Sequence, residues 1–95
     1  METQFYILIS LKKENDPESF ARFFIGNNRE QAYRIFRRLN STGEISEKDI
    51  LYLEFMETRE NLPVNLEMIS CNLSQLAENC KIITKEIFKM SLSPN

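Results

Sequence analysis

The stretch ILYLEFME at Ile50–Glu57 decides the fold of this chain, because it has two possible conformations. The preceding polar residues Ser46–Asp49 could cap a helix that continues through the stretch. Its residues also alternate, with Leu51, Leu53 and Phe55 against Tyr52 and Glu54. Alternation with period two is typical of a strand that is buried on one face. We therefore predict a strand and keep the helix as the alternative.

The residues that follow favour the strand, because another alternating run lies close by. Val64–Met68 reads VNLEM, and the polar segment Arg59–Pro63 separates it from the first run. Two alternating runs joined by a short segment rich in turn residues are the pattern of a β-hairpin. Arg59–Pro63 is the predicted connection.

The N-terminal half begins with a second pair of predicted strands. Phe5–Leu11 is rich in aromatic and β-branched residues on both faces, which predicts a central strand. The charged segment Lys12–Pro17 ends in Asp-Pro and predicts a turn. A further strand is expected over Ser19–Ile25, and Gly26 follows it.

A helix is predicted after each pair of strands, because the same capping pattern occurs twice. Asn28 with Gln31, and Asn72 with Gln75, fit capping boxes. The first helix should bury Ala32, Ile35, Phe36 and Leu39 and end at Asn40–Gly43. The second should bury Leu73, Leu76, Ala77, Cys80, Ile83 and Ile87 and end near Met90.

The predicted fold is α+β, with the element order ββαββα in a single domain spanning residues 1–95. It is one four-stranded, mainly antiparallel sheet with both helices packed on one face, a two-layer sandwich. If the most apolar strands, the first and third, are central, the strand order is 2-1-3-4. Other strand orders remain open.

Composition favours a cytoplasmic protein. Hydrophobic residues make up 42% of the chain and charged residues 27%, and the formal net charge is −2. No apolar run approaches the roughly 20 residues that cross a bilayer, so we expect no membrane association. Cys71 and Cys80 lie nine residues apart, more than about 10 Å along a helix, and are expected to be free thiols.

The absence of histidine argues against catalysis. Histidine is the commonest general base near neutral pH and the commonest metal ligand. No phosphate-binding glycine loop and no cysteine cluster with zinc spacing is present. Glu54 and Glu67 are more often solvated strand residues than an acid–base pair. We therefore predict no enzyme, no cofactor and no metal site.

The face of the sheet opposite the helices is the predicted interaction surface. The residues expected there are Tyr6, Leu8, Phe24, Tyr52 and Glu54. Apolar and aromatic patches of more than a few hundred Å² usually mark interaction sites. A second copy of the chain, giving a homodimer, or another protein partner is expected to cover this face.

Two other functions follow from different residues. Arg22, Arg29, Arg34, Arg37 and Arg38 could hold an anion or nucleic acid, as in sheet proteins that bind single-stranded RNA. The element order, the lack of an RNP-like motif and the negative net charge make this the alternative. Cys71 would directly precede the last helix, where the helix dipole can lower a thiol pKa, so a thiol-dependent enzyme or redox sensor is a third class.

Overall fold

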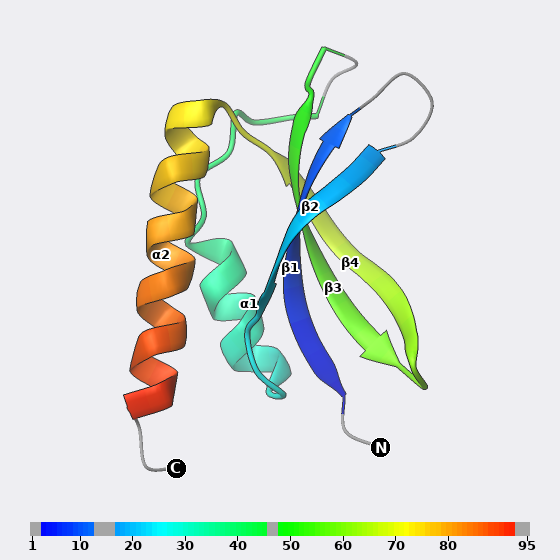
Figure 1. The fold of residues 1–95 in the computed structure, drawn as a ribbon, viewed down its shortest axis with the longest axis vertical. Coiled ribbons are helices and arrows are strands. Elements are labelled where there is room, and N and C mark those ends of the chain that lie inside the picture. Colours follow the sequence, from blue (N-terminus) through cyan, green and yellow to red (C-terminus); the bar gives the residue numbers. More distant parts are fainter. Residues whose placement is uncertain (1–2, 13–16, 46–47, 93–95) are drawn as a thin grey trace.

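The computed structural model describes residues 3–12, 17–45 and 48–92. The chain forms four strands and two helices in the order ββαββα (Figure 1). The elements are β1 (Gln4–Lys12), β2 (Pro17–Phe24), α1 (Arg29–Arg37), β3 (Leu51–Arg59), β4 (Leu62–Ser70) and α2 (Leu73–Leu92). The predicted fold class is confirmed. The deciding stretch is a strand, and the helical alternative for it is wrong.

The strands form one sheet in the order β2-β1-β3-β4, and each neighbouring pair is antiparallel. The predicted order 2-1-3-4 is therefore confirmed. The two central strands come from different halves of the chain, and Ile7 of β1 lies opposite Phe55 of β3. Both helices cover the same side of the sheet, which leaves the other side without a helix (Figure 1).

The strands are longer than predicted, because the connections between them are tighter. Only Glu60 and Asn61 lie between β3 and β4, and both have positive φ, 51° and 68°. Two residues with positive φ match the type I′ turn that closes short hairpins. Arg59 and Leu62 face each other across the hairpin instead of belonging to a five-residue connection. Ser46 and Glu47 lie outside the described residues.

Both helices begin at the predicted caps. The side-chain oxygen of Asn28 accepts a 2.9 Å hydrogen bond from the backbone N–H of Gln31. At α2 the box is reciprocal, since Asn72 accepts from Gln75 N–H at 2.8 Å and Gln75 accepts from Asn72 N–H at 3.0 Å. Each cap satisfies backbone donors that a helix start leaves free.

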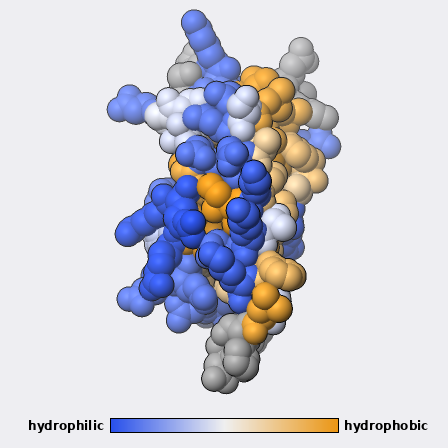
Figure 2. Space-filling view, turned by 90° about the vertical axis from the view of Figure 1, so that its left-hand side faces the viewer, coloured by the Kyte–Doolittle hydropathy of each residue, from blue (hydrophilic) through white to orange (hydrophobic). Residues whose placement is uncertain are grey.

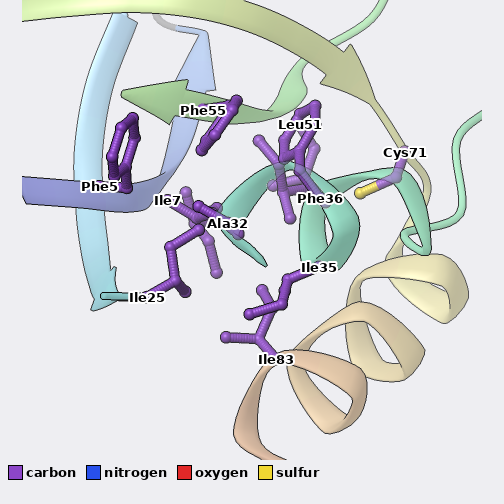
Figure 3. Packing of buried hydrophobic residues seen from close by; sticks show 12 residues of the cluster. Phe5, Ile7, Ile25, Ala32, Ile35, Phe36, Leu51, Phe55, Cys71 and Ile83 are labelled. Atoms are coloured by element: carbon purple, nitrogen blue, oxygen red, sulfur yellow. The ribbon is translucent and has the colours of Figure 1, made fainter. Parts of the chain in front are cut away.

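The core lies between the helices and the sheet (Figure 3). Figure 3 shows Phe55 and Leu51 of the sheet pointing toward Phe36 of α1, and Ile83 of α2 meeting Ile35. The Phe55 ring stacks on Phe36 at 5.2 Å between centroids. Aromatic pairs at such distances add to the stabilisation that burial alone provides.

The buried side of α2 differs from the predicted apolar stripe at one important position. Asn79 is fully buried, donates to the carbonyl of Asn40 at 2.9 Å and accepts from its N–H at 2.7 Å. This pair of bonds ties the middle of α2 to the segment that follows α1. Leu73 and Ala77, both predicted to be buried, are exposed instead. Leu73 belongs to the first turn of α2, at the edge of the stripe, so the core does not reach it.

Candidate interaction surfaces

The predicted interaction residues do share one face of the sheet. The register places Tyr6 beside Phe24 and Leu8 beside Glu54, on the side away from the helices. Phe24 is 49% exposed, and Leu8 and Glu54 are half-buried. Tyr6 and Tyr52, however, are only 5% and 8% exposed. The expectation that these two rings would be open to solvent is therefore wrong.

Neighbouring groups of the same chain cover both tyrosines. The guanidinium of Arg22, on the edge strand β2, lies 4.2 Å from the centroid of the Tyr6 ring. The Tyr52 hydroxyl donates a 2.7 Å hydrogen bond to the carbonyl of Asp49. A cation over an aromatic face is attracted by the ring and also shields it from water. Both tyrosines are thus engaged by groups of their own chain.

A polar network crosses the same face from β2 to β4. Ser10 donates to one oxygen of Glu54 at 2.6 Å, and Asn65 donates to the other at 2.9 Å. Ser10 also bonds the hydroxyl of Ser19 at 3.2 Å. Glu67 lies opposite Phe55 in the register, on the other face of the sheet, so Glu54 and Glu67 do not form a carboxylate pair. Both Glu54 oxygens are engaged in structural bonds.

An apolar groove lies at the side of the molecule, between β2 and the start of α2. It encloses about 430 Å³ and is lined by Leu11, Glu18, Phe20, Leu51, Leu73 and Leu76. Phe20 is 57% exposed and Leu73 is 78% exposed. Phe20 is the extra residue of a bulge, since Ala21 pairs with Ile9 and Ser19 pairs with the next residue, Ser10. The alternating pattern of β2 could not predict this side-chain position.

Further apolar side chains are exposed on α2. A Cβ atom at Gly26, just after β2, would lie 3.8 Å from the sulfur of Met90, so β2 and α2 run alongside each other in the same direction (Figure 1). Phe88 and Leu92 are exposed near the end of α2. Figure 2 shows hydrophobic residues gathered along one flank of the largely hydrophilic face that α2 presents. We call the groove with Phe88 and Leu92 the β2–α2 flank.

The five arginines of the predicted anion surface do not form one patch, although Arg29, Arg34 and Arg37 line the same pocket beside α1. Arg22 lies on the open face over Tyr6, and Arg38 forms a 2.7 Å ion pair with Glu86 of α2. Arg29 reaches from α1 to Glu57 of β3 at 3.0 Å. Arg34 and Arg37 have no ion pair within the described residues.

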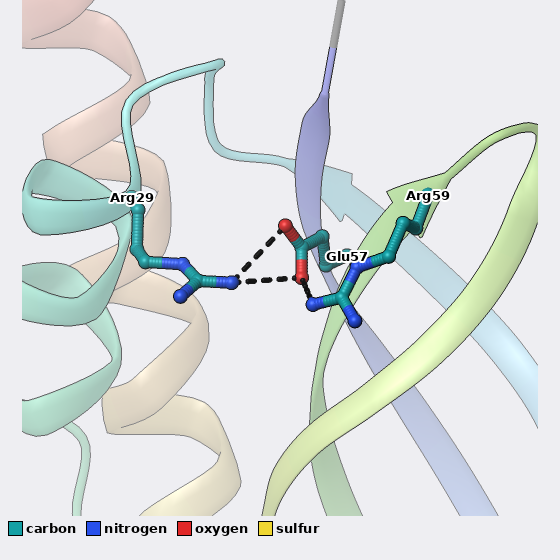
Figure 4. A network of polar contacts seen from close by, with 3 residues as sticks. All are labelled: Arg29, Glu57 and Arg59. Carbon is teal, nitrogen blue, oxygen red and sulfur yellow. Dashed lines mark hydrogen bonds and ion pairs between the residues drawn. The ribbon is translucent and has the colours of Figure 1, made fainter.

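Glu57 is the centre of a buried ion-pair network on the helix side of the sheet. Figure 4 shows its carboxylate between Arg29 and Arg59, and Arg59 lies 2.6 Å from it. The Glu57 side chain is 7% exposed, whereas both guanidiniums are more than half exposed. A buried carboxylate needs such partners to offset its desolvation. The two arginines leave the network with a net positive charge.

Burial favours the protonated form of both cysteines. Both are free thiols, as predicted. Burial raises the pKa of Cys71 above its usual value, and a hydrogen bond with Asn79 offsets this only in part. Burial also raises the pKa of Cys80. A raised pKa keeps the thiol protonated, and the thiolate is the reactive form.

Within residues 3–12, 17–45 and 48–92, no group of three or more potential metal-binding side chains occurs. No helix in the described part of the chain is long and apolar enough to span a bilayer. Comparison of the chain with protein-family models, with curated proteins and with solved structures finds no match.

Proposed function

We propose that this protein is a non-enzymatic interaction module that pairs with a second copy of itself through the β2–α2 flank. The observation that carries the proposal is the apolar groove, in which the walls expose Phe20 and Leu73 beside a hollow of about 430 Å³. In a two-fold pair, the same patch of each copy must provide both a protruding side chain and a hollow that receives the side chain of the other copy. Leu73 provides the protrusion, and the groove beside it provides the hollow.

The area of the flank supports a folded partner of the same kind. Large apolar side chains bring about 150–250 Å² each, so Phe20, Leu73, Phe88 and Leu92 at their exposures offer on the order of 400–500 Å². An interface of about 800 Å² per partner that is roughly 60% apolar buries a similar area of apolar surface on each partner.

The position of β2 also supports pairing. It is an edge strand of the sheet, and an edge leaves a row of backbone donors and acceptors without a neighbouring strand. The flank therefore combines apolar side chains with an open sheet edge. Pairing two copies here would cover both features at once.

Sedimentation equilibrium of the full chain tests the proposal, with an expected mass of twice the 11.2 kDa protomer. Leu73→Glu should yield the monomer, because a charge would enter the apolar contact. An acidic residue in the first turn of a helix is favourable, so this variant should fold. Phe24→Ser on the open face is the matched control and should remain a dimer.

Three results would contradict the proposal. A monomeric unmodified protein at high concentration would exclude self-association. A dimer that survives both Leu73→Glu and Phe20→Ser would place the contact elsewhere. If Phe24→Ser dissociates the dimer and Leu73→Glu does not, the interface lies on the open sheet face.

A further inference from the structure

We propose a second binding site, for a phosphomonoester group, on the side of α1 that faces β3. A pocket of about 410 Å³ is lined by Arg29, Glu30, Tyr33, Arg34 and Arg37. Two of these residues contact β3, since Arg29 pairs with Glu57 and the Tyr33 ring packs against Phe55. The volume falls within the range of about 300–1,000 Å³ that small-molecule sites occupy.

The charges in this pocket are not neutralised by the protein. Arg34 and Arg37 form no ion pair with any residue in the described ranges. Arg29, at the pocket wall, shares the carboxylate of Glu57 with a second arginine, so the Glu57 network leaves a positive charge. Among the residues that the structure describes, Glu30 is the one acid that lines the pocket. This local excess of positive charge contrasts with the overall charge of −2.

The donors are held in place by the core. The guanidinium of Arg37 lies 4.8 Å from the centroid of the Tyr33 ring. Tyr33 in turn packs edge-on against Phe55, with 5.0 Å between centroids, and Phe55 is fully buried. Stacking fixes the plane of the guanidinium and leaves its N–H groups free to donate. The Tyr33 hydroxyl has no hydrogen-bond partner within the part of the chain that the structure describes.

This set of donors suits a terminal phosphate better than a nucleic-acid backbone. A phosphomonoester carries up to two charges on three acceptor oxygens, which two guanidiniums and one phenol can bond together. A nucleic acid would need cations that follow successive phosphates. Arg22 lies on the opposite face of the sheet and Arg38 bonds Glu86, so the arginines form no continuous track.

The test is a titration of the full chain with O-phosphoserine, followed by backbone amide NMR shifts. Shifts should concentrate on α1, and Arg37→Ala or Arg34→Ala should weaken binding about tenfold, the effect of one lost charge-assisted bond. Glu30→Gln should strengthen binding, because it removes a negative charge from the pocket wall. Arg22→Ala is the matched control, since Arg22 also covers a tyrosine ring, and it should bind like the unmodified protein.

Several outcomes would overturn the assignment. Equal binding by Arg34→Ala, Arg37→Ala and the unmodified protein would remove the site. An equal loss of affinity in Arg22→Ala would mean that O-phosphoserine is attracted by positively charged side chains in general and not by this pocket. Tighter binding of a short single-stranded oligothymidylate, with a steep dependence on salt, would indicate a polyanion surface instead. The dimer test does not affect these results, because the pocket lies on α1 and not on the β2–α2 flank.

Discussion

On the helix side of the sheet, Ile7, Leu53 and Phe55 are fully buried under two helices. On the other side, Tyr6 and Tyr52 are nearly as buried with no helix above them. The first set is sealed by stacked rings and branched side chains. The second is covered by a long arginine and a backbone carbonyl. Low solvent exposure of a sheet face therefore does not require a second layer of structure.

The two kinds of cover should differ in strength. Side chains of a close-packed core cannot shift to fill a gap, whereas long surface side chains can move and water can enter. Substitutions at equivalent places on the two faces can measure this difference.

The largest expected effect is in the adjacent pair Phe55 and Met56, which point to opposite faces of β3. Phe55→Ala should lower the free energy of unfolding by about 3–5 kcal/mol, because it leaves a cavity in the core. Met56→Ala should cost about 2 kcal/mol, the low end for such a change, since the open face can collapse. Urea unfolding at equal protein concentration measures both, with Phe55→Leu as a milder variant. Equal losses for the two alanine variants would mean that the faces are packed alike.

A smaller effect is expected from two carboxylates on opposite faces. Glu57→Gln removes the charge that Arg29 and Arg59 share and should cost about 1–3 kcal/mol, as for hydrogen bonds between charged groups. Glu54→Gln should cost less than about 1 kcal/mol, because its partners Ser10 and Asn65 are neutral. Urea unfolding at low and high salt checks both. A greater loss of unfolding free energy in Glu54→Gln than in Glu57→Gln would contradict this prediction.

The smallest effect concerns the cover over Tyr6. Arg22→Ala should cost about 0.5–1 kcal/mol, the value of an exposed cation–π contact, and should expose the ring. The chain has no tryptophan, so acrylamide quenching of tyrosine fluorescence reports this exposure directly. Arg34→Ala, which uncovers no ring, is the control. Unchanged quenching in Arg22→Ala would show that other atoms cover Tyr6.

Local patterns in the sequence were sufficient to predict the fold. Alternation predicted β3 and β4, the apolar run Phe5–Leu11 and the segment Ser19–Ile25 predicted β1 and β2, and the caps at Asn28 and Asn72 predicted the two helices. Each of these signals lies within a few residues of the strand or helix that it predicts. The sequence left the strand order open, and the observed order is the one expected when the two most apolar strands are central.

The surfaces were harder to predict, because they depend on contacts between elements. Whether Tyr6 is exposed depends on Arg22 of the neighbouring strand, and the position of Phe20 depends on a bulge. Asn79 gave no signal, since a polar residue on a helix is usually solvated, yet it bonds a loop that is distant in sequence. The β2–α2 flank requires α2 to lie alongside β2, which no local pattern specifies.

The pairing of β1 with β3 has a consequence for synthesis on the ribosome. While the first half emerges, β1 can pair with β2, but its other edge has no partner until β3 has been made. Contacts between residues far apart in sequence form late, after the intervening chain has been ordered. The edge of β1 that carries Phe5, Ile7 and Ile9 therefore stays without its partner strand until β3, which ends at Arg59, has emerged from the ribosome.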